Sequence, residues 1–170
     1  YRAYANVEWS ASKRIVLNGG VIGEDNDTGT FGSYRVASNF QLAEDQALRL
    51  AFNRGYRAPT LLERHQATYI RYDENLILDG GVIADSEVTR ERLSSTEIGY
   101  TAAFSEANIT LDVRVFREGL RDIIGERREQ FADVNGQINI RDNTDTINVQ
   151  GVEWQAAYRP SSQFLVHANY

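Results

Sequence analysis

A polar segment from Arg64 to Asp73, RHQATYIRYD, carries the side chains of this sequence that are best suited to hold a small ligand. The candidate ligand-binding residues are Arg64, His65, Tyr69, Arg71 and Tyr72. Guanidinium groups make charge-assisted hydrogen bonds to anions, and tyrosine rings add flat surfaces with a polar tip. This combination predicts a site for an anionic, aromatic or metal-chelated ligand. The alternative is an exposed loop whose tyrosines pack on neighbouring loops.

No set of residues predicts catalysis or a resident metal. The two histidines, His65 and His167, lie far apart, cysteine is absent and no HExxH pattern occurs. Asp25 and Asp27 have a calcium-like spacing in DNDTGT, but Val36 stands where a calcium loop needs a bidentate acid. We therefore expect a non-enzyme without cofactor or metal. DNDTGT is then a polar turn, with a weak calcium contact as the alternative.

The composition narrows the class of protein. The 170 residues include 18 basic and 24 acidic side chains, a formal net charge of -6. This charge argues against a nucleic-acid partner, because such proteins need a basic surface. The lack of cysteine removes disulfides and thiol chemistry and leaves the redox compartment open. No apolar run reaches the roughly 20 residues of a membrane-spanning helix.

The elements that must position the candidate site are alternating stretches of apolar and polar residues, the pattern of half-buried β-strands. They begin at Tyr1, Arg14, Ser33, Ala47, Ser95, Ile109, Thr146 and Gln163. Each runs about 9 to 12 residues, whereas strands of soluble proteins usually have about 5 or 6. We expect an all-β fold, an antiparallel up-and-down meander of about eight long strands.

The connections fall into two kinds. Tight turns are expected at Ser10–Lys13, Ala43–Gln46, Ser105–Ala107 and Arg159–Ser162, and longer polar connections at Asp25–Phe31, Tyr56 to about Leu93, and Gly125 to about Asp145. Their strict alternation places all turns at one end of the sheet and all loops at the other. An outer-membrane β-barrel has this form, with short periplasmic turns and longer outer loops. A soluble β-sandwich also alternates, so a sandwich that acts as a binding or adhesion module remains the alternative.

The two faces of the expected sheet differ in kind. Aromatic residues lie near strand ends on the apolar faces, as in the interfacial girdle of a barrel, at Trp9, Tyr34, Phe40, Tyr100, Phe104, Trp154 and Tyr158. The polar faces carry arginines at 35, 49 and 114. We expect these to form salt bridges in the barrel lumen with Glu97, Asp112 or Glu153, rather than to contact a ligand.

One strand ends with a characteristic motif. In RLAFNRGYRAPTLLE the alternation breaks at Gly55, where glycine permits a bend, and Pro59 ends the ladder because it cannot donate a hydrogen bond. We interpret Arg57, Ala58 and Pro59 as a stop signal at the outer rim.

This motif and several others resemble the barrel domain of TonB-dependent outer-membrane receptors. LRLAFNRGYRAPTLLE resembles a barrel strand that enters an extracellular loop. GSYRVASNFQL, RLSSTEIGYTAAF, LDVRVFREGLRDII and NVQGVEWQAAY resemble neighbouring strands in matching order. The resemblance extends over nearly the whole chain and is most specific from residue 33 to residue 158.

The resemblance implies a function as well as a fold. Residues 1–170 would be a partial barrel domain, a fragment of a barrel of about 22 strands whose plug domain and remaining strands are absent. Such a receptor lies in the outer membrane of a Gram-negative bacterium, in contact with its lipid. It imports a scarce nutrient, such as a ferric siderophore, cobalamin or an oligosaccharide, without covalent chemistry. An inner-membrane energy-coupling protein would act through an N-terminal region absent here. The isolated fragment would have open edges through which copies can associate.

Overall fold

The structure is a computed structural model, and it describes residues 1–68, 81–85, 87–130 and 137–170. The elements in chain order are β1 (Arg2–Ser12), β2 (Ile15–Asn26), β3 (Gly29–Ala43), β4 (Gln46–Arg57), α1 (Leu61–His65), β5 (Ala67–Thr68), β6 (Gly81–Ala84), β7 (Glu91–Phe104), a 3-10 turn (Ser105–Ala107), β8 (Ile109–Gln130), β9 (Gln137–Ser161) and β10 (Phe164–Asn169). In this part of the chain, no helix has both the length and the apolar character needed to cross a membrane.

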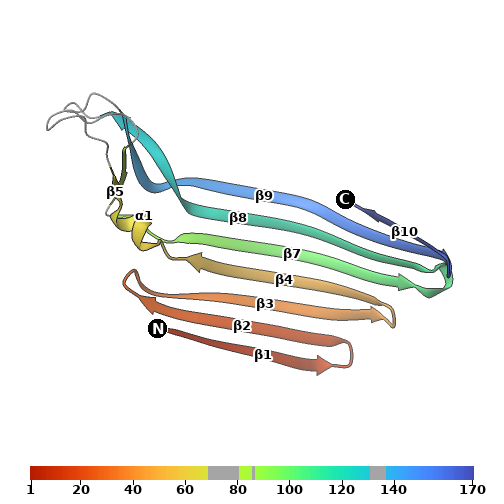
Figure 1. The fold of residues 1–170 in the computed structure, drawn as a ribbon. Helices are drawn as coiled ribbons and strands as arrows, with labels where there is room; N and C mark the ends of the chain where they lie inside the picture. Colours follow the sequence, from red (N-terminus) through yellow and green to blue (C-terminus); the bar gives the residue numbers. More distant parts are fainter. Residues whose placement is uncertain (69–80, 86, 131–136) are drawn as a thin grey trace.

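The strands of the described residues form a single 10-stranded sheet, which confirms the predicted all-β meander. Its order is β1-β2-β3-β4-β7-β8-β9, with antiparallel neighbours throughout, and β10 pairs with β9. β6 also pairs with β9, in parallel, and β5 pairs with β6. Figure 1 shows these strands side by side, with the tight turns at one end and α1 and β5 at the other. We call these the turn end and the loop end.

The first connection at the loop end is shorter than the sequence predicts. β2 ends at Asn26 and β3 begins at Gly29, so the expected Asp25–Phe31 loop is a tight hairpin. The Asn26 side chain accepts hydrogen bonds from the backbone nitrogen (2.9 Å) and hydroxyl (2.6 Å) of Thr28, and Gly29 has a φ of 101°. The side-chain turn and the glycine conformation let the strands run to their tips. The predicted strict alternation of short and long connections is therefore wrong at this point.

The predicted polar loop from Gly125 to about Asp145 is mostly strand. β8 has 22 residues and β9 has 25, and their ladder continues to Gln130 opposite Gln137. Where both faces of a strand meet water, polar side chains do not mark a loop. β6 lies against β9, where Ile138 and Ile140 are only 3% and 7% exposed.

The end of β4 also differs from the prediction. The ladder with β7 runs unbroken through Gly55 to Arg57, which is opposite Glu91. Gly55 therefore does not interrupt the ladder. The strand ends two residues before Pro59, as expected for a residue that cannot donate to the ladder.

The register confirms two faces of opposite character. Leu48 is opposite Tyr100 and Leu50 is opposite Ile98 on one face, while Arg49 and Glu97 lie on the other. Large apolar side chains of the first face are exposed, including Trp9 at 62%. The described residues form one sheet with no second sheet against this face, so the soluble β-sandwich alternative does not hold.

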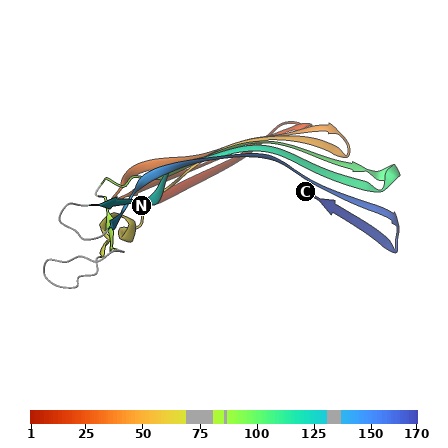
Figure 2. The ribbon, with the colours of Figure 1, turned by 90° about the horizontal axis from the view of Figure 1, so that it is seen from above.

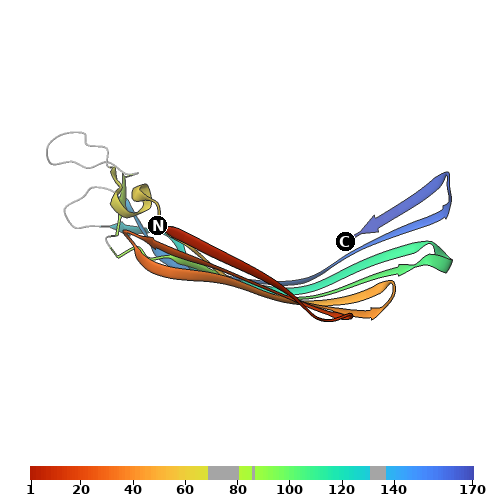
Figure 3. The same cartoon turned by 90° about the horizontal axis from the view of Figure 1, so that it is seen from below.

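The polar face is the concave one. Figures 2 and 3 show a bent sheet with α1 on its concave side. Glu63 of α1 binds Arg57, which shares the polar face of β4 with Arg49. A barrel section whose polar face lines the lumen also has this face on its concave side.

Candidate functional site

A short helix forms the centre of the candidate site at the loop end. α1 begins after Thr60, whose hydroxyl accepts a hydrogen bond from the Glu63 backbone nitrogen at 3.2 Å, while the Glu63 carboxylate accepts one from the Thr60 nitrogen at 2.7 Å. These reciprocal bonds form a capping box, which satisfies two donors at the start of the helix. Thr60 and Glu63 in APTLLE have the Thr-x-x-Glu spacing of a capping box, a sequence signal for a helix that the predicted strand end at this motif does not include.

Arg57 ties this helix to the sheet. Its two terminal nitrogens bind the Glu63 carboxylate at 3.0 and 3.1 Å, and its Nε binds Glu91 at 2.6 Å. The hydrogen bonds from Arg57 lower the pKa of Glu63 to about 2. They also lower the pKa of Glu91, which accepts a further bond from the Ile124 backbone nitrogen. The residue that the sequence suggested as part of a stop signal therefore anchors α1 to β4 and β7.

Two of the five predicted ligand-binding residues lie on this helix. Arg64 reaches the β2–β3 hairpin, where it forms an ion pair with Asp27 at 2.9 Å. His65 is exposed at the end of α1. Tyr69, Arg71 and Tyr72 lie outside the described residues.

The DNDTGT aspartates have protein partners. Asp27 binds Arg64, and Asp25 accepts a hydrogen bond from the Thr30 hydroxyl at 2.7 Å. The described residues contain no group of three or more potential metal ligands. The segment is therefore an anchor for α1 as well as a turn.

Arg64 lines a hollow of about 390 Å³ between the hairpin and the segment before β7. Its lining residues are Asp27, Thr28, Arg64, Glu87, Val88, Thr89 and Arg90. Arg90 donates to the carbonyls of Thr28 (3.1 Å) and Thr30 (3.3 Å) and lies over the ring of Phe31 at 4.8 Å. The hollow thus brings two guanidinium groups and two acids together. Arg90 was not among the predicted site residues, although the charged run DSEVTRERL contains it.

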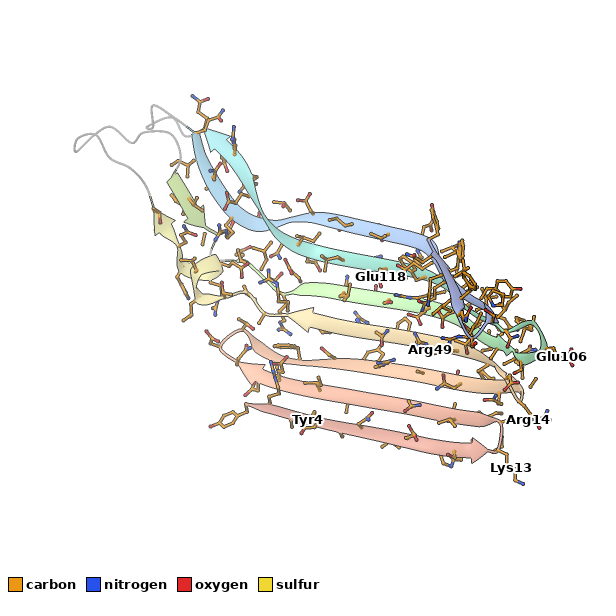
Figure 4. All side chains as sticks on the ribbon, turned by 45° about the vertical axis from the view of Figure 1, so that its right-hand side comes forward. Tyr4, Lys13, Arg14, Arg49, Glu106 and Glu118 are labelled. Atoms are coloured by element: carbon orange, nitrogen blue, oxygen red, sulfur yellow. The ribbon has the colours of Figure 1, made fainter. Side chains whose placement is uncertain are left out.

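A second polar cluster crosses the concave face at mid-height. Glu97, only 7% exposed, binds both Arg49 and Arg114, the latter at 2.8 Å. Arg114 also contacts Glu153 at 3.3 Å and Glu118 at 3.5 Å. Figure 4 shows Arg49 and Glu118 on β4 and β8, well away from Lys13, Arg14 and Glu106 at the turn end. The predicted salt bridges are confirmed for Arg49 and Arg114. Within the described chain, Arg35 and Asp112 make no ion pair.

A family model settles what this sheet is a part of. The model for the β-barrel of TonB-dependent receptor-like proteins matches residues 1–170. This chain belongs to the TonB-dependent receptor family, as part of its barrel. The family comprises outer-membrane receptors and transporters of Gram-negative bacteria rather than enzymes, and its members bind small nutrients such as siderophores.

Solved structures of receptors and transporters share the fold. A point mutant of the ferric enterobactin receptor PfeA from Pseudomonas aeruginosa, in complex with enterobactin, matches 99% of the chain with a TM-score of 0.79 and 16% identity. The siderophore receptor PirA from the same organism matches 99% with a TM-score of 0.83 and 15% identity. The copper transporter OprC matches 99% with a TM-score of 0.71 and 15% identity.

The chain spans only 26%, 32% and 28% of these three solved chains. At such low identities the likeness concerns the fold alone. A comparison with curated protein sequences finds no match.

Proposed function

We propose that this chain is a section of the barrel of an outer-membrane receptor that binds a scarce nutrient at the loop end and imports it without covalent chemistry. The loop end faces the outside and the turn end faces the periplasm, as in other outer-membrane barrels. The match of the family model to the whole chain is the observation that carries this proposal. Import requires a plug and an inner-membrane energy-coupling protein that acts on it.

The substrate class that we propose is a metal-bound nutrient, and a ferric siderophore is the leading candidate. The solved structures that the chain resembles include two siderophore receptors and a copper transporter. The loop-end hollow supports an anionic ligand, because Arg64 and Arg90 both line it. Arg64, His65, Tyr69, Arg71 and Tyr72 remain the proposed ligand-binding residues.

Uptake by cells tests the proposal. The full-length receptor is produced in a Gram-negative host without siderophore receptors of its own, and iron uptake is measured with a panel of ferric siderophores. We expect uptake of at least one, and its loss when the proton-motive force is dissipated. The proposal would be contradicted if uptake of every siderophore were the same with and without the receptor. It would also be contradicted if uptake continued after the proton-motive force is dissipated.

Two variants separate ligand binding from structural support. Arg64→Gln removes the guanidinium, whereas Asp27→Asn breaks the same ion pair and leaves Arg64 free. If Arg64 binds ligand, the first variant weakens binding about tenfold, as expected for a lost charge-assisted hydrogen bond, and the second does not. Equal losses would make Arg64 a purely structural residue.

A further inference from the structure

The apolar face changes character toward the loop end. On β8 its side chains run from Ile109 through Val115 and then become Arg117 and Arg121. The cross-strand register places Arg54 of β4 on the same face in the row of Gly119, and Arg92 of β7 one row nearer the loop end, opposite Arg121. We call Arg54, Arg92, Arg117 and Arg121 the arginine patch. It lies directly beyond the apolar rows.

A glycine, which has no side chain, lies at the centre of the arginine patch and forms its floor. Gly119 lies between Arg117 and Arg121 on β8, opposite Ser94 of β7 and Asn148 of β9. A Cβ atom at Gly119 would lie 3.2 Å from Asn148 Oδ1 and 3.4 Å from Ser94 Oγ. Two polar side chains thus converge above a glycine, with arginines on either side along the strand.

The arginines of the patch lack close acidic partners, whereas arginines on the polar face form ion pairs with glutamates. Among the described residues, Arg54, Arg117 and Arg121 form no ion pair, and Arg92 approaches Asp122 only at 3.9 Å. Arg92 and Arg121 are direct cross-strand partners, an arrangement of like charges that is unfavourable without an anion between them. Arg49 and Arg114 on the polar face, by contrast, share Glu97.

A groove leads from the arginine patch into the apolar rows. This groove, of about 710 Å³, is lined at its polar end by Arg117 and Gln150. One row nearer the turn end it is lined by Ile98, Val115 and Val152. An amphiphile with an anionic head and an apolar chain matches this order of side chains.

We propose that the arginine patch binds the phosphate group of an outer-leaflet membrane lipid, with Gly119 as the floor of the phosphate site. Charge complementarity selects the phosphate, because unpaired guanidinium groups at headgroup height bind phosphate oxygens in bidentate fashion. The adjoining groove takes the first part of an acyl chain. This inference rests on the proposed location of the sheet in an outer membrane and on no particular nutrient.

The test measures lipid binding by the full-length receptor in phosphatidylcholine nanodiscs. The probes are lipid A and the same lipid A stripped of its phosphates. We expect the wild type to bind only the phosphorylated form, and binding to fall roughly fivefold for each of Arg117→Gln and Arg121→Gln. The matched control is Arg35→Gln, which removes one exposed, unpaired arginine from the polar face and leaves binding unchanged.

Equal binding of the two forms of lipid A, wild-type binding by both patch variants, or an equal loss in Arg35→Gln would overturn the proposal. Inorganic phosphate is added as a competitor to identify the source of the phosphate group. We expect it not to displace lipid A; full displacement at equal concentration would assign the site to soluble phosphate and overturn the lipid assignment.

Gly119→Val tests the phosphate site without a change of charge. Valine suits a strand, and its side chain fills the space between the arginines, so we expect lipid A binding to fall about 25-fold, the equivalent of two fivefold arginine steps. Retention of wild-type binding would contradict the assigned floor. Heat-dependent gel mobility reports folding of each variant. Nutrient binding is measured on the same nanodiscs, so that its loss alone counts against the proposed import function and not against the lipid site.

Discussion

Arg57 shows how one side chain can organise the loop end. Its guanidinium binds Glu63 on α1 and Glu91 on β7, and both carboxylates have lowered pKa values as a result. Because the pair is partly exposed, it serves mainly to fix the position of α1 rather than to stabilise the whole sheet.

The lowered pKa of Glu63 predicts how the loop end responds to acid. Glu63 titrates near 2 in the folded protein, against an ordinary value of 4.5. Its stabilising contribution is therefore complete above about 4.5 and is lost as the pH falls toward about 2. A spin label at exposed Leu62 in the full-length receptor should stay immobile at pH 4 and become mobile near pH 2.

The control for this titration is Glu63→Gln, which removes the carboxylate. The label should then be mobile across the whole pH range. A wild-type label that is already mobile between pH 6 and pH 4 would contradict the assigned anchor.

Glu97 predicts a different effect, on the barrel itself. Glu97→Gln leaves Arg49 and Arg114 without their shared carboxylate on the concave face. We expect the free energy of unfolding to fall by about 2 kcal/mol, less than for a fully buried pair because both arginines are partly exposed. Urea unfolding of the full-length receptor in vesicles measures it.

The comparison for Glu97 is Glu153→Gln, on the same cluster. Glu153 is 55% exposed and makes one contact to Arg114, so its loss should cost less than about 0.5 kcal/mol. Equal costs for the two variants would show that the shared carboxylate has no special role.

At the scale of elements, the segment before β7 is held to the sheet by Asn143. The Asn143 side chain accepts from the Thr89 nitrogen at 2.7 Å and donates to the carbonyls of Thr89 (3.1 Å) and Asp122 (2.5 Å). These bonds position Arg90 and one wall of the loop-end hollow.

Asn143→Ala should release this segment. We expect faster hydrogen exchange from Glu87 to Arg90, with unchanged exchange in β4 and β8, because the mutation removes local bonds and leaves the long ladders intact. Exchange mass spectrometry of the full-length receptor measures this. Asn39→Ala, on the polar face of β3, is the control, and unchanged exchange in Asn143→Ala would contradict the assigned anchor.

At the scale of the whole molecule, the alternation of faces predicts which residues meet lipid. Leu111 and Val113 share the apolar face of β8, and Asp112 between them lies on the opposite face. Spin labels at 111 and 113 of the full-length receptor in vesicles should be accessible to oxygen, and a label at 112 to a water-soluble nickel chelate. The same accessibility at all three positions would contradict a membrane-spanning sheet.

The edges of the sheet predict the behaviour of the isolated chain. Among the described strands, β1 pairs only with β2 and β10 only with β9, so backbone donors and acceptors remain free along both edges. Such edges and an exposed apolar face favour association. We expect the 170-residue chain to form oligomers in detergent, measured by light scattering. A stable monomer would contradict this expectation.

The sequence by itself determined the faces, the turn end and the family. Alternation with a period of two assigns each side chain to a face, and a ladder preserves that assignment whatever its partner strand is. For this reason Leu48, Arg49 and Glu97 lie where the pattern placed them. The salt bridges of Arg49 and Arg114 followed from the opposite charges on one face.

Only the tertiary structure decided what happens at the loop end. Polar residues such as Glu126 and Asn139 predict a loop, yet the pairing of β8 with β9 places them in strands. The candidate site joins Asp27, Arg64 and Arg90, and local sequence patterns do not record contacts between residues that far apart. The arginine patch likewise needs the register of β4, β7 and β8, because single arginines on separate strands become a site only when the ladders bring them into neighbouring rows of one face.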